Sequence, residues 1–329
     1  MSNAIKNILV TGGAGFIGSH LCGTLLDRGC RVTVIDDLST GRMENIAPLL
    51  NRAGFLFFKN SIMNKGLMDH LVSETDEIYH LAAVVGVKNI VEDPVRTLHT
   101  IIVGTDTVLE LAHAHGNKKV FIASTSEVYG KSPDCPYSEE DDRVLGSTTR
   151  SRWSYSSAKA VDEYMALAYF NKENLPVVIG RLFNTVGPRQ TGQYGMVLPR
   201  FVRQALTGSP ITVYGDGGQS RTFSYVVDVV GAIIELMDYP PAMGEIFNIG
   251  SEEEITIMEL AERVKTITGS SSDIITITYE EAYGEGFEDM QRRVPNISKI
   301  RDAIGFEPKT ALDDIIRAVA EWIEKTGRA

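Results

Sequence analysis

The first 180 or so residues alternate between short apolar runs and longer stretches in which apolar residues recur every three or four positions. Short apolar runs predict buried strands, and the three-to-four spacing predicts amphipathic helices. The predicted strands span residues 8–10, 31–36, 77–83, 119–124 and 175–179, and the clearest helices span residues 93–115 and 156–172. This alternation predicts an α/β fold, a doubly wound parallel sheet of Rossmann type with helices on both faces.

The rhythm changes after Arg181. Residues 184–195 are rich in turn formers and have no apolar period, which predicts a loop that lines a site. Further along, the pattern predicts helices at residues 198–207, 227–237, 258–266 and 312–325, and strands at residues 211–214 and 274–279. These elements indicate a smaller, interleaved second lobe. We expect residues 1–182 plus about 223–250 to form the sheet domain, and residues 183–222 plus about 251–329 to form the C-terminal lobe.

Composition narrows the class of protein. Hydrophobic residues make up 43% and charged residues 23%, as in ordinary globular proteins. The net charge of −11 gives no overall attraction to nucleic acid or to an anionic membrane, so any phosphate must be held locally. Three scattered cysteines and the absence of a signal-peptide pattern predict a cytoplasmic protein. The six histidines show no ligand spacing, so no metal site is predicted.

A glycine-rich turn follows the first strand. Gly12, Gly15 and Gly18 lie three apart at the start of a helix, where they would let a pyrophosphate approach the helix N-terminus. The alternative is a tight turn without a ligand. Asp36 ends the second strand, 18 residues after Gly18, where its carboxylate would accept the ribose hydroxyls of adenosine and repel a 2′-phosphate. NAD is therefore favoured over NADP, although Arg42 offers a cation for a 2′-phosphate if it is not simply a solvated loop residue.

A second pattern indicates acid–base chemistry. Tyr155 and Lys159 lie four apart, hence on one face of the predicted helix, and a cation beside a phenol lowers its pKa. The phenolate would then act as a general base near neutral pH. The alternative is a surface pair without a role. Residues 124–127, with the sequence Ser-Thr-Ser-Glu, support the first interpretation because they end a strand at the carboxyl edge of the sheet, where doubly wound folds bind ligands.

Taken in order, the motifs TGGAGFIG, STSEVYG, YSSAK, RLFNTVGPRQ, VYGDGGQSRTF and RRVP resemble those of the extended short-chain dehydrogenase/reductases that modify nucleotide sugars. The resemblance implies an NAD-binding Rossmann domain, a C-terminal lobe for a UDP-sugar, and a homodimer packed through the two long helices. It also implies a triad of Thr125, Tyr155 and Lys159. Where the family usually has Asn in an Asn-x-x-Gly-Thr stretch, this chain has Ile101, so a polar contact is absent or replaced there.

The triad would oxidise the sugar at C4 to a 4-keto intermediate. The pair Ser126 and Glu127 resembles that of UDP-glucuronate decarboxylases, because simple 4-epimerases have small neutral residues there. Glu127 would assist the proton step after carbon dioxide leaves. We therefore predict decarboxylation of UDP-glucuronate to UDP-xylose. The alternatives are a UDP-sugar 4-epimerase acting on UDP-glucose or UDP-glucuronate, a 4,6-dehydratase similar to the GDP-mannose enzymes, and a non-catalytic NAD sensor, which would lack a member of the triad.

The candidate site residues fall into three groups by expected role. The catalytic residues are Thr125, Glu127, Tyr155 and Lys159. The cofactor-binding residues are Gly12, Gly15, Phe16, Ile17, Gly18, Asp36, Leu81, Ala82, Ala83, Tyr155 and Lys159. The substrate-binding residues are Ser126, Asn184, Arg189, Tyr214, Arg221 and Arg293. Arg221 would hold the diphosphate, and Arg293 either the diphosphate or, facing Glu127, the substrate carboxylate. Tyr214 would stack on uracil or belong to the core, and Arg292 is expected to be solvated.

Overall fold

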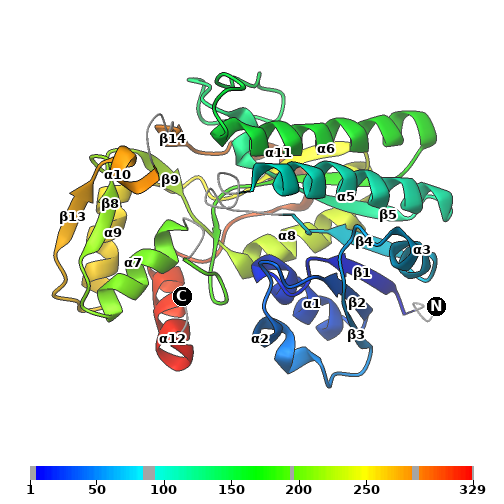
Figure 1. Cartoon of the computed structure of the whole chain (residues 1–329), viewed down its shortest axis with the longest axis horizontal. Coiled ribbons are helices and arrows are strands. Elements are labelled where there is room, and N and C mark those ends of the chain that lie inside the picture. The colour runs from blue at the N-terminus through cyan, green and yellow to red at the C-terminus, as the bar shows by residue number, and fades with distance from the viewer. Residues whose placement is uncertain (1–4, 84–92, 193–195, 284–288, 328–329) are drawn as a thin grey trace.

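A computed structural model describes residues 5–83, 93–192, 196–283 and 289–327 (Figure 1). Its centre is a seven-stranded sheet in the order β11-β6-β5-β4-β1-β2-β3, in which every pair of neighbours is parallel. The strands are β1 (Asn7–Thr11), β2 (Arg31–Asp36), β3 (Phe55–Lys59), β4 (Glu77–His80), β5 (Lys119–Thr125), β6 (Val177–Leu182) and β11 (Glu245–Ile249). The predicted fold class, a doubly wound parallel sheet, is confirmed.

Helices cover both faces of the sheet. Alternate residues of β1 point to opposite faces, so Val10 packs in the cluster that contains α1 and α8 residues, while Leu9 packs in the cluster beneath α3, α5 and α6. The helices of the two layers are α1 (Phe16–Asp27), α8 (Val226–Asp238), α3 (Lys65–Ser73), α5 (Pro94–Ala114) and α6 (Arg152–Glu173). Each fully buried aliphatic side chain in these clusters contributes roughly 1.5–3 kcal/mol. The result is a rigid platform whose carboxyl edge faces the second lobe.

Several predictions for this domain differ from the structure in their bounds. The strand predicted at residues 77–83 is β4, which ends at His80. The helix predicted at residues 156–172 begins four residues earlier, at Arg152, because the first turn is anchored by buried Arg152 and Trp153. The strand predicted at residues 175–179 is β6, which extends to Leu182. β3 and α3 were not predicted, because β3 is only partly buried and α3 is short. In the structure, the Asn64 side chain caps α3 by accepting a hydrogen bond from the Leu67 amide.

The second lobe has a core of its own, built by α7, α9 and α12 around β8. Its elements are α7 (Val197–Leu206), β8 (Ile211–Tyr214), β9 (Ser220–Thr222), β12 (Glu254–Thr256), α9 (Ile257–Ile267), β13 (Ile274–Ile277), α10 (Tyr279–Tyr283), β14 (Arg292–Arg293) and α12 (Leu312–Thr326). β9 lies between β12 and β14. Figure 1 shows this lobe beside the carboxyl edge of the main sheet.

Short elements connect these parts. They are α2 (Met43–Ile46), η1 (Ala47–Leu49), η2 (Ser126–Tyr129), β7 (Thr185–Val186), β10 (Ser224–Tyr225), η3 (Pro240–Ala242) and α11 (Ser298–Ile304). The predicted division assigned residues 251–329 to the second lobe, but α11 packs against α8 and β11, and Ile300 belongs to the core of the sheet domain. The rest of that division stays a prediction. Among the described residues, no helix is long and apolar enough to cross a membrane.

Candidate active site

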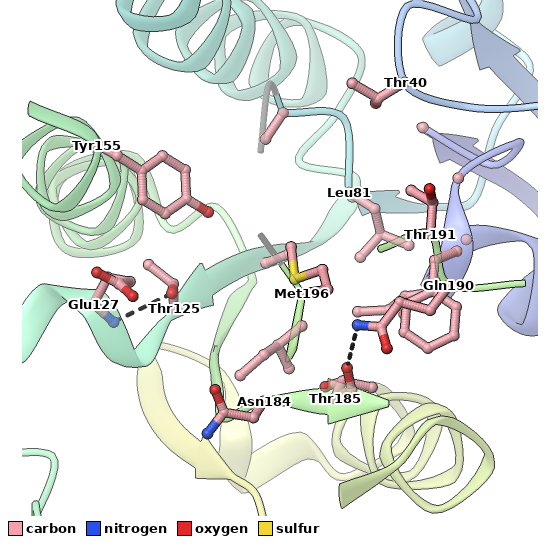
Figure 2. A pocket seen from close by; sticks show the side chains of 18 of the residues that line it. Thr40, Leu81, Thr125, Glu127, Tyr155, Asn184, Thr185, Gln190, Thr191 and Met196 are labelled. Carbon is pink, nitrogen blue, oxygen red and sulfur yellow. Dashed lines mark hydrogen bonds between the residues drawn. The ribbon is translucent and has the colours of Figure 1, made fainter. Parts of the chain in front are cut away.

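One cavity lies between the carboxyl edge of the sheet and the second lobe, and every predicted site residue lines it. Figure 2 shows Tyr155 projecting from α6 into this cavity, with Thr125 and Glu127 below it at the end of β5. The predicted loop at 184–195 also contributes, through residues 184–186 and 189–191, while residues 193–195 lie outside the described parts of the chain. In the described ranges no cluster of His, Cys, Asp or Glu could hold a metal ion.

The glycine turn leaves space beside the N-terminus of α1. Gly12 has φ +72°, and a Cβ there would lie 2.8 Å from the Ala82 nitrogen. A Cβ on Gly18 would lie 2.3 Å from the Gly12 oxygen. Gly15, the N-cap of α1, has no side chain to accept hydrogen bonds from the first-turn amides. These amides and the positive end of the helix dipole suit a diphosphate, so the residues present fit NAD.

Asp36, at the end of β2, lines the cavity close to the glycine turn. Its carboxylate accepts hydrogen bonds from the backbone amides of Ala14 (3.0 Å) and Leu38 (2.8 Å). Burial raises the pKa of Asp36, and these hydrogen bonds oppose that shift. Arg42 lines the same cavity, so the two charges that would favour NAD and NADP respectively are both present.

We expect Asp36→Ala to weaken NAD binding at least about tenfold, because a hydrogen bond to a charged group is worth roughly 1.5–3 kcal/mol. Isothermal titration calorimetry with NAD and NADP measures this directly. Asp27→Ala is the control, since Asp27 lies on α1 in an exposed ion pair with Arg52. Tighter binding of NADP than of NAD by the unmutated protein would overturn the assignment of Asp36.

The predicted base does not have the lowered pKa that was expected. Removal from water, reinforced by the charges of Glu127 and Asp162, raises the pKa of the Tyr155 phenol, and the Thr125 hydroxyl only partly opposes this. The charge of the neighbouring lysine is engaged elsewhere. Lys159 Nζ donates a hydrogen bond to Asp162 Oδ2 at 2.6 Å, and both side chains are buried. The cation is therefore neutralised by a carboxylate on its own helix.

Glu127 lies in a cluster of charges at the other side of the triad. Its carboxylate forms ion pairs with Arg152 (2.5 Å) and with Arg293. Arg221 pairs with Asp289 at 2.9 Å, and Arg152 approaches the same carboxylate at 4.0 Å. Burial alone would raise the pKa of Glu127, but the arginines outweigh it and lower the pKa to about 2. The residue expected to act as an acid is therefore ionised here, because two guanidinium groups hold it.

This lowered pKa predicts a dependence of stability on pH. A carboxyl group whose pKa falls from about 4.5 to about 2 on folding stabilises the folded state fully above about pH 4.5. The contribution is lost as pH falls toward about 2. We expect the difference in unfolding free energy between wild type and Glu127→Gln to shrink as urea titrations move from pH 6 to about pH 3. A difference independent of pH would show that Glu127 is not the depressed group.

The predicted substrate residues meet the expectations to different degrees. Arg293 faces Glu127 and donates a second hydrogen bond to Asn184 Oδ1, while its role toward the diphosphate or the substrate carboxylate stays a prediction. Arg292 is largely exposed and pairs with Glu254 at 2.8 Å, as expected of a solvated arginine. Tyr214 lines the cavity, but the Arg200 guanidinium lies 3.8 Å from its ring centroid and covers one face.

Arg189 also lines the cavity, from the loop after β7. It has φ +73°, and burial lowers its pKa. The preceding Pro188 carbonyl accepts a hydrogen bond from His20 Nε2 on α1 at 2.9 Å. This contact ties the loop to the helix whose N-terminus faces the cavity. Arg189 and the glycine turn therefore keep a defined spacing.

Sequence reasoning missed three residues of the site. Arg152 lies three residues before Tyr155 and Asp162 three residues after Lys159, so helical spacing alone put both on the face that carries the dyad. Asp289 had no such signal, because it follows an irregular stretch. Ile101 is buried on α5, and one turn later Thr105 Oγ1 lies at hydrogen-bond distance, 3.1 Å, from His80 Nε2.

The parallel sheet, the glycine turn before α1 and the Thr125, Tyr155 and Lys159 triad at the sheet edge define an extended short-chain dehydrogenase/reductase. The family model described as GDP-mannose 4,6 dehydratase matches residues 9–319, and the chain belongs to this family. The resemblance inferred from the motifs is confirmed.

Relatives named as nucleotide-sugar decarboxylases align with nearly the whole chain. A UDP-N-acetyl-alpha-D-glucosaminuronate decarboxylase of Bacillus cytotoxicus is 42% identical over 97% of this chain and 98% of its own. UDP-glucuronic acid decarboxylase 1 of Xenopus tropicalis is 36% identical over 97% of this chain and 72% of its own.

Among solved structures, UDP-glucose 4-epimerase of Thermotoga maritima with UDP-glucose has a TM-score of 0.88 and 32% identity, covering 98% of this chain and 100% of its own. UDP-glucuronic acid 4-epimerase of Bacillus cereus, in complex with UDP-glucuronic acid and NAD, has a TM-score of 0.87 and 29% identity, covering 97% of this chain and 99% of its own. The bound NAD in that structure supports the predicted cofactor.

Proposed function

We propose that this chain binds NAD and decarboxylates a UDP-linked uronate through a 4-keto intermediate. The observation that carries the proposal is the charge cluster beside the triad. Among the described residues, Arg152, Arg221 and Arg293 meet the carboxylates of Glu127 and Asp289 there. Guanidinium groups bind carboxylates bidentately, so this cluster suits a sugar carboxylate that competes with Glu127 or Asp289 for the arginines. The decarboxylase relatives at 42% and 36% identity support the same reaction class.

The chemistry begins at C4 of the sugar. Tyr155 accepts the proton of the C4 hydroxyl, and Thr125 donates a hydrogen bond to the same oxygen. Bound NAD supplies the hydride acceptor for this oxidation and the donor for the final reduction. Lys159 stabilises the phenolate form of Tyr155 to the extent that Asp162 leaves its charge available.

The product of this oxidation is a β-keto acid, since the C6 carboxylate is two carbons from the new ketone. Its C5–C6 bond breaks, carbon dioxide leaves, and the electron pair moves onto the C4 oxygen as an enolate held by Tyr155 and Thr125. C5 then takes a proton. A uronate carboxylate that competes with Glu127 for Arg293 weakens the Glu127–Arg293 ion pair. The pKa of Glu127 then rises, so that Glu127 can carry the proton to C5. Reduction at C4 completes the reaction.

Incubation with UDP-glucuronate, UDP-N-acetylglucosaminuronate and UDP-glucose tests the proposal. We expect carbon dioxide from a uronate and a pentose product by NMR, UDP-xylose in the case of UDP-glucuronate. The Bacillus cytotoxicus relative favours the N-acetylated uronate as the alternative substrate. The epimerase neighbours favour a second function, 4-epimerisation. A galacto-configured product without carbon dioxide from any of the three would establish that reaction and refute decarboxylation.

We further propose that two copies pair through α5 and α6. The outer faces of these helices carry exposed Val95, Val161 and Tyr164, which a neighbouring copy would bury. Size-exclusion chromatography with light scattering tests this, with Tyr164→Glu expected to shift a dimer toward monomer. A monomeric wild type would refute the pairing.

Three free cysteines among the described residues support a reducing, cytoplasmic location.

A further inference from the structure

The ion pair between Glu127 and Arg293 joins segments that are 166 residues apart. Glu127 lies on η2, a single four-residue turn that follows β5 in the sheet domain. Arg293 lies on β14, a two-residue strand that pairs with β9 in the second lobe. Elements this short do not fix a side chain by themselves. The geometry of the ion pair therefore depends on contacts that join η2 to the segment around β14.

η2 is fixed through Tyr129, two residues after Glu127. The Tyr129 side chain is 0% exposed, and its hydroxyl accepts a hydrogen bond from Arg181 Nη1 at 2.9 Å and donates one to Asn248 Oδ1 at 2.7 Å. Arg181, on β6, is held in turn by two hydrogen bonds to the Glu163 carboxylate, at 3.0 and 2.8 Å. The end of η2 is therefore attached to β6 and β11, the two strands beyond β5 in the sheet.

The segment that follows β14 is fixed through the loop between η2 and α6. The Tyr137 amide in this loop donates a hydrogen bond to the Val294 carbonyl at 2.8 Å, and the Tyr137 carbonyl accepts one from the Asn296 amide at 2.8 Å. These bonds pair the loop with the segment as two strands pair. The buried Tyr137 ring stacks on the Tyr129 ring, with centroids 4.7 Å apart. Arg293 directly precedes this segment, so its position follows from that of the loop.

Asn248 on β11 is the residue at which the two attachments meet. Its side chain accepts the Tyr129 hydroxyl and donates to the carbonyls of Tyr137 at 2.9 Å and Asn296 at 3.3 Å. Carbonyl oxygens can only accept, so the amide nitrogen of Asn248 must face them and its amide oxygen must face Tyr129. A leucine of similar size would make none of these bonds. One fully buried side chain thus connects η2 with the segment after β14.

We propose that Asn248 is a positioning residue, which holds the Glu127–Arg293 pair in the geometry that receives a uronate carboxylate. This deepens the function proposed above and rests on it, because a carboxylate is the group expected at Arg293. Asn248 does not line the cavity, so it acts through Tyr129 and Tyr137 and not on the substrate itself. A bidentate contact between guanidinium and carboxylate requires a defined geometry. Loss of Asn248 should therefore weaken the binding of a uronate more than that of a neutral sugar.

Binding of two nucleotide sugars to the NADH-loaded protein tests this proposal, because the reduced cofactor cannot oxidise either sugar. UDP-glucuronate carries the carboxylate, and UDP-glucose is its neutral counterpart with the same nucleotide. We expect Asn248→Ala to raise the Kd of UDP-glucuronate about tenfold and to change that of UDP-glucose by less than about twofold in isothermal titration calorimetry. Tyr129→Phe keeps the stacked ring and removes only the hydroxyl. It should show the same selectivity with a smaller change, and it decides the matter if Asn248→Ala does not fold.

Thr75→Val is the matched control for the loss of a buried hydrogen bond. Thr75 is 3% exposed, donates to the Leu71 carbonyl at 2.8 Å and does not line the cavity. This variant should lower the stability and leave both Kd values unchanged. If Asn248→Ala and Tyr129→Phe weaken the two nucleotide sugars equally, or weaken neither, the inference is overturned.

A second measurement needs no substrate and separates this inference from the proposed function. In urea titrations near neutral pH, Glu127→Gln should shift the unfolding midpoint less in the Tyr129→Phe background than in the wild type, because a displaced ion pair contributes less. Equal shifts in the two backgrounds overturn the positioning role. A wild type that binds UDP-glucuronate no better than UDP-glucose refutes the uronate site instead, and the urea titrations then decide on the positioning role alone.

Discussion

Tyr155→Phe is expected to lower the rate of hydride transfer by roughly 10²–10⁴, the usual contribution of a positioned general base. The substitution keeps the ring and removes the phenol oxygen that projects from α6 toward the end of β5 (Figure 2). The near-ultraviolet absorbance of reduced nicotinamide, followed after mixing with a nucleotide sugar, measures the step directly.

Tyr164→Phe is the matched control for this experiment. Tyr164 lies on the same helix, is 66% exposed and does not line the cavity. Binding of NAD and of the nucleotide sugar should survive in both variants, since neither ring is removed. Turnover of Tyr155→Phe at a rate close to that of Tyr164→Phe would remove Tyr155 from the mechanism.

Glu127→Gln is expected to separate the two halves of the reaction. The initial oxidation depends on Thr125, Tyr155 and Lys159, so reduced nicotinamide should still accumulate on adding a UDP-uronate. Release of the pentose product should fall by at least about 10², because the amide can neither carry the proton to C5 nor neutralise Arg152 and Arg293. Stopped-flow absorbance and product NMR on one sample separate the steps.

Glu140→Gln, an exposed change shortly after η2, is the control for charge loss. A Glu127→Gln enzyme that forms product at the wild-type rate, or that loses oxidation and product formation equally, contradicts the proposed role. The second result would mean that Glu127 serves mainly to hold the arginines in the shape that the substrate needs.

The sheet and the glycine turn could be predicted because their causes are local. Gly12 needs a positive φ and a close approach to Ala82, and such constraints appear in the sequence as fixed spacings. The dyad was visible for the same reason, since four residues make one helical turn. The partners that set its pKa were harder to see. Thr125 and Glu127 act on the Tyr155 phenol only because the end of β5 and η2 pack against α6.

Contacts between residues far apart in the sequence could not be predicted from the spacing of residues within a motif. Glu127 and Arg293 are 166 residues apart, and only the resemblance of the motifs suggested that they meet. The protonation of Glu127 could not be predicted at all, because it depends on Arg152 and Arg293 arriving together in a buried place. Charge state is a property of the assembled cluster rather than of any one motif.

The seventh strand carries a consequence for anyone who recombines these enzymes. β11 joins the sheet beside β6 only after the chain has built α7 to β10, and β6 would be a bare edge without it. A truncation anywhere between residues 183 and 244 would remove β11 and leave β6 as an open, aggregation-prone edge. Swapping specificity between relatives therefore calls for replacing lobe segments on both sides of β11 while β6 and β11 stay with one parent. Chimeras that take β6 and β11 from different parents should be less soluble than those that keep the two strands together.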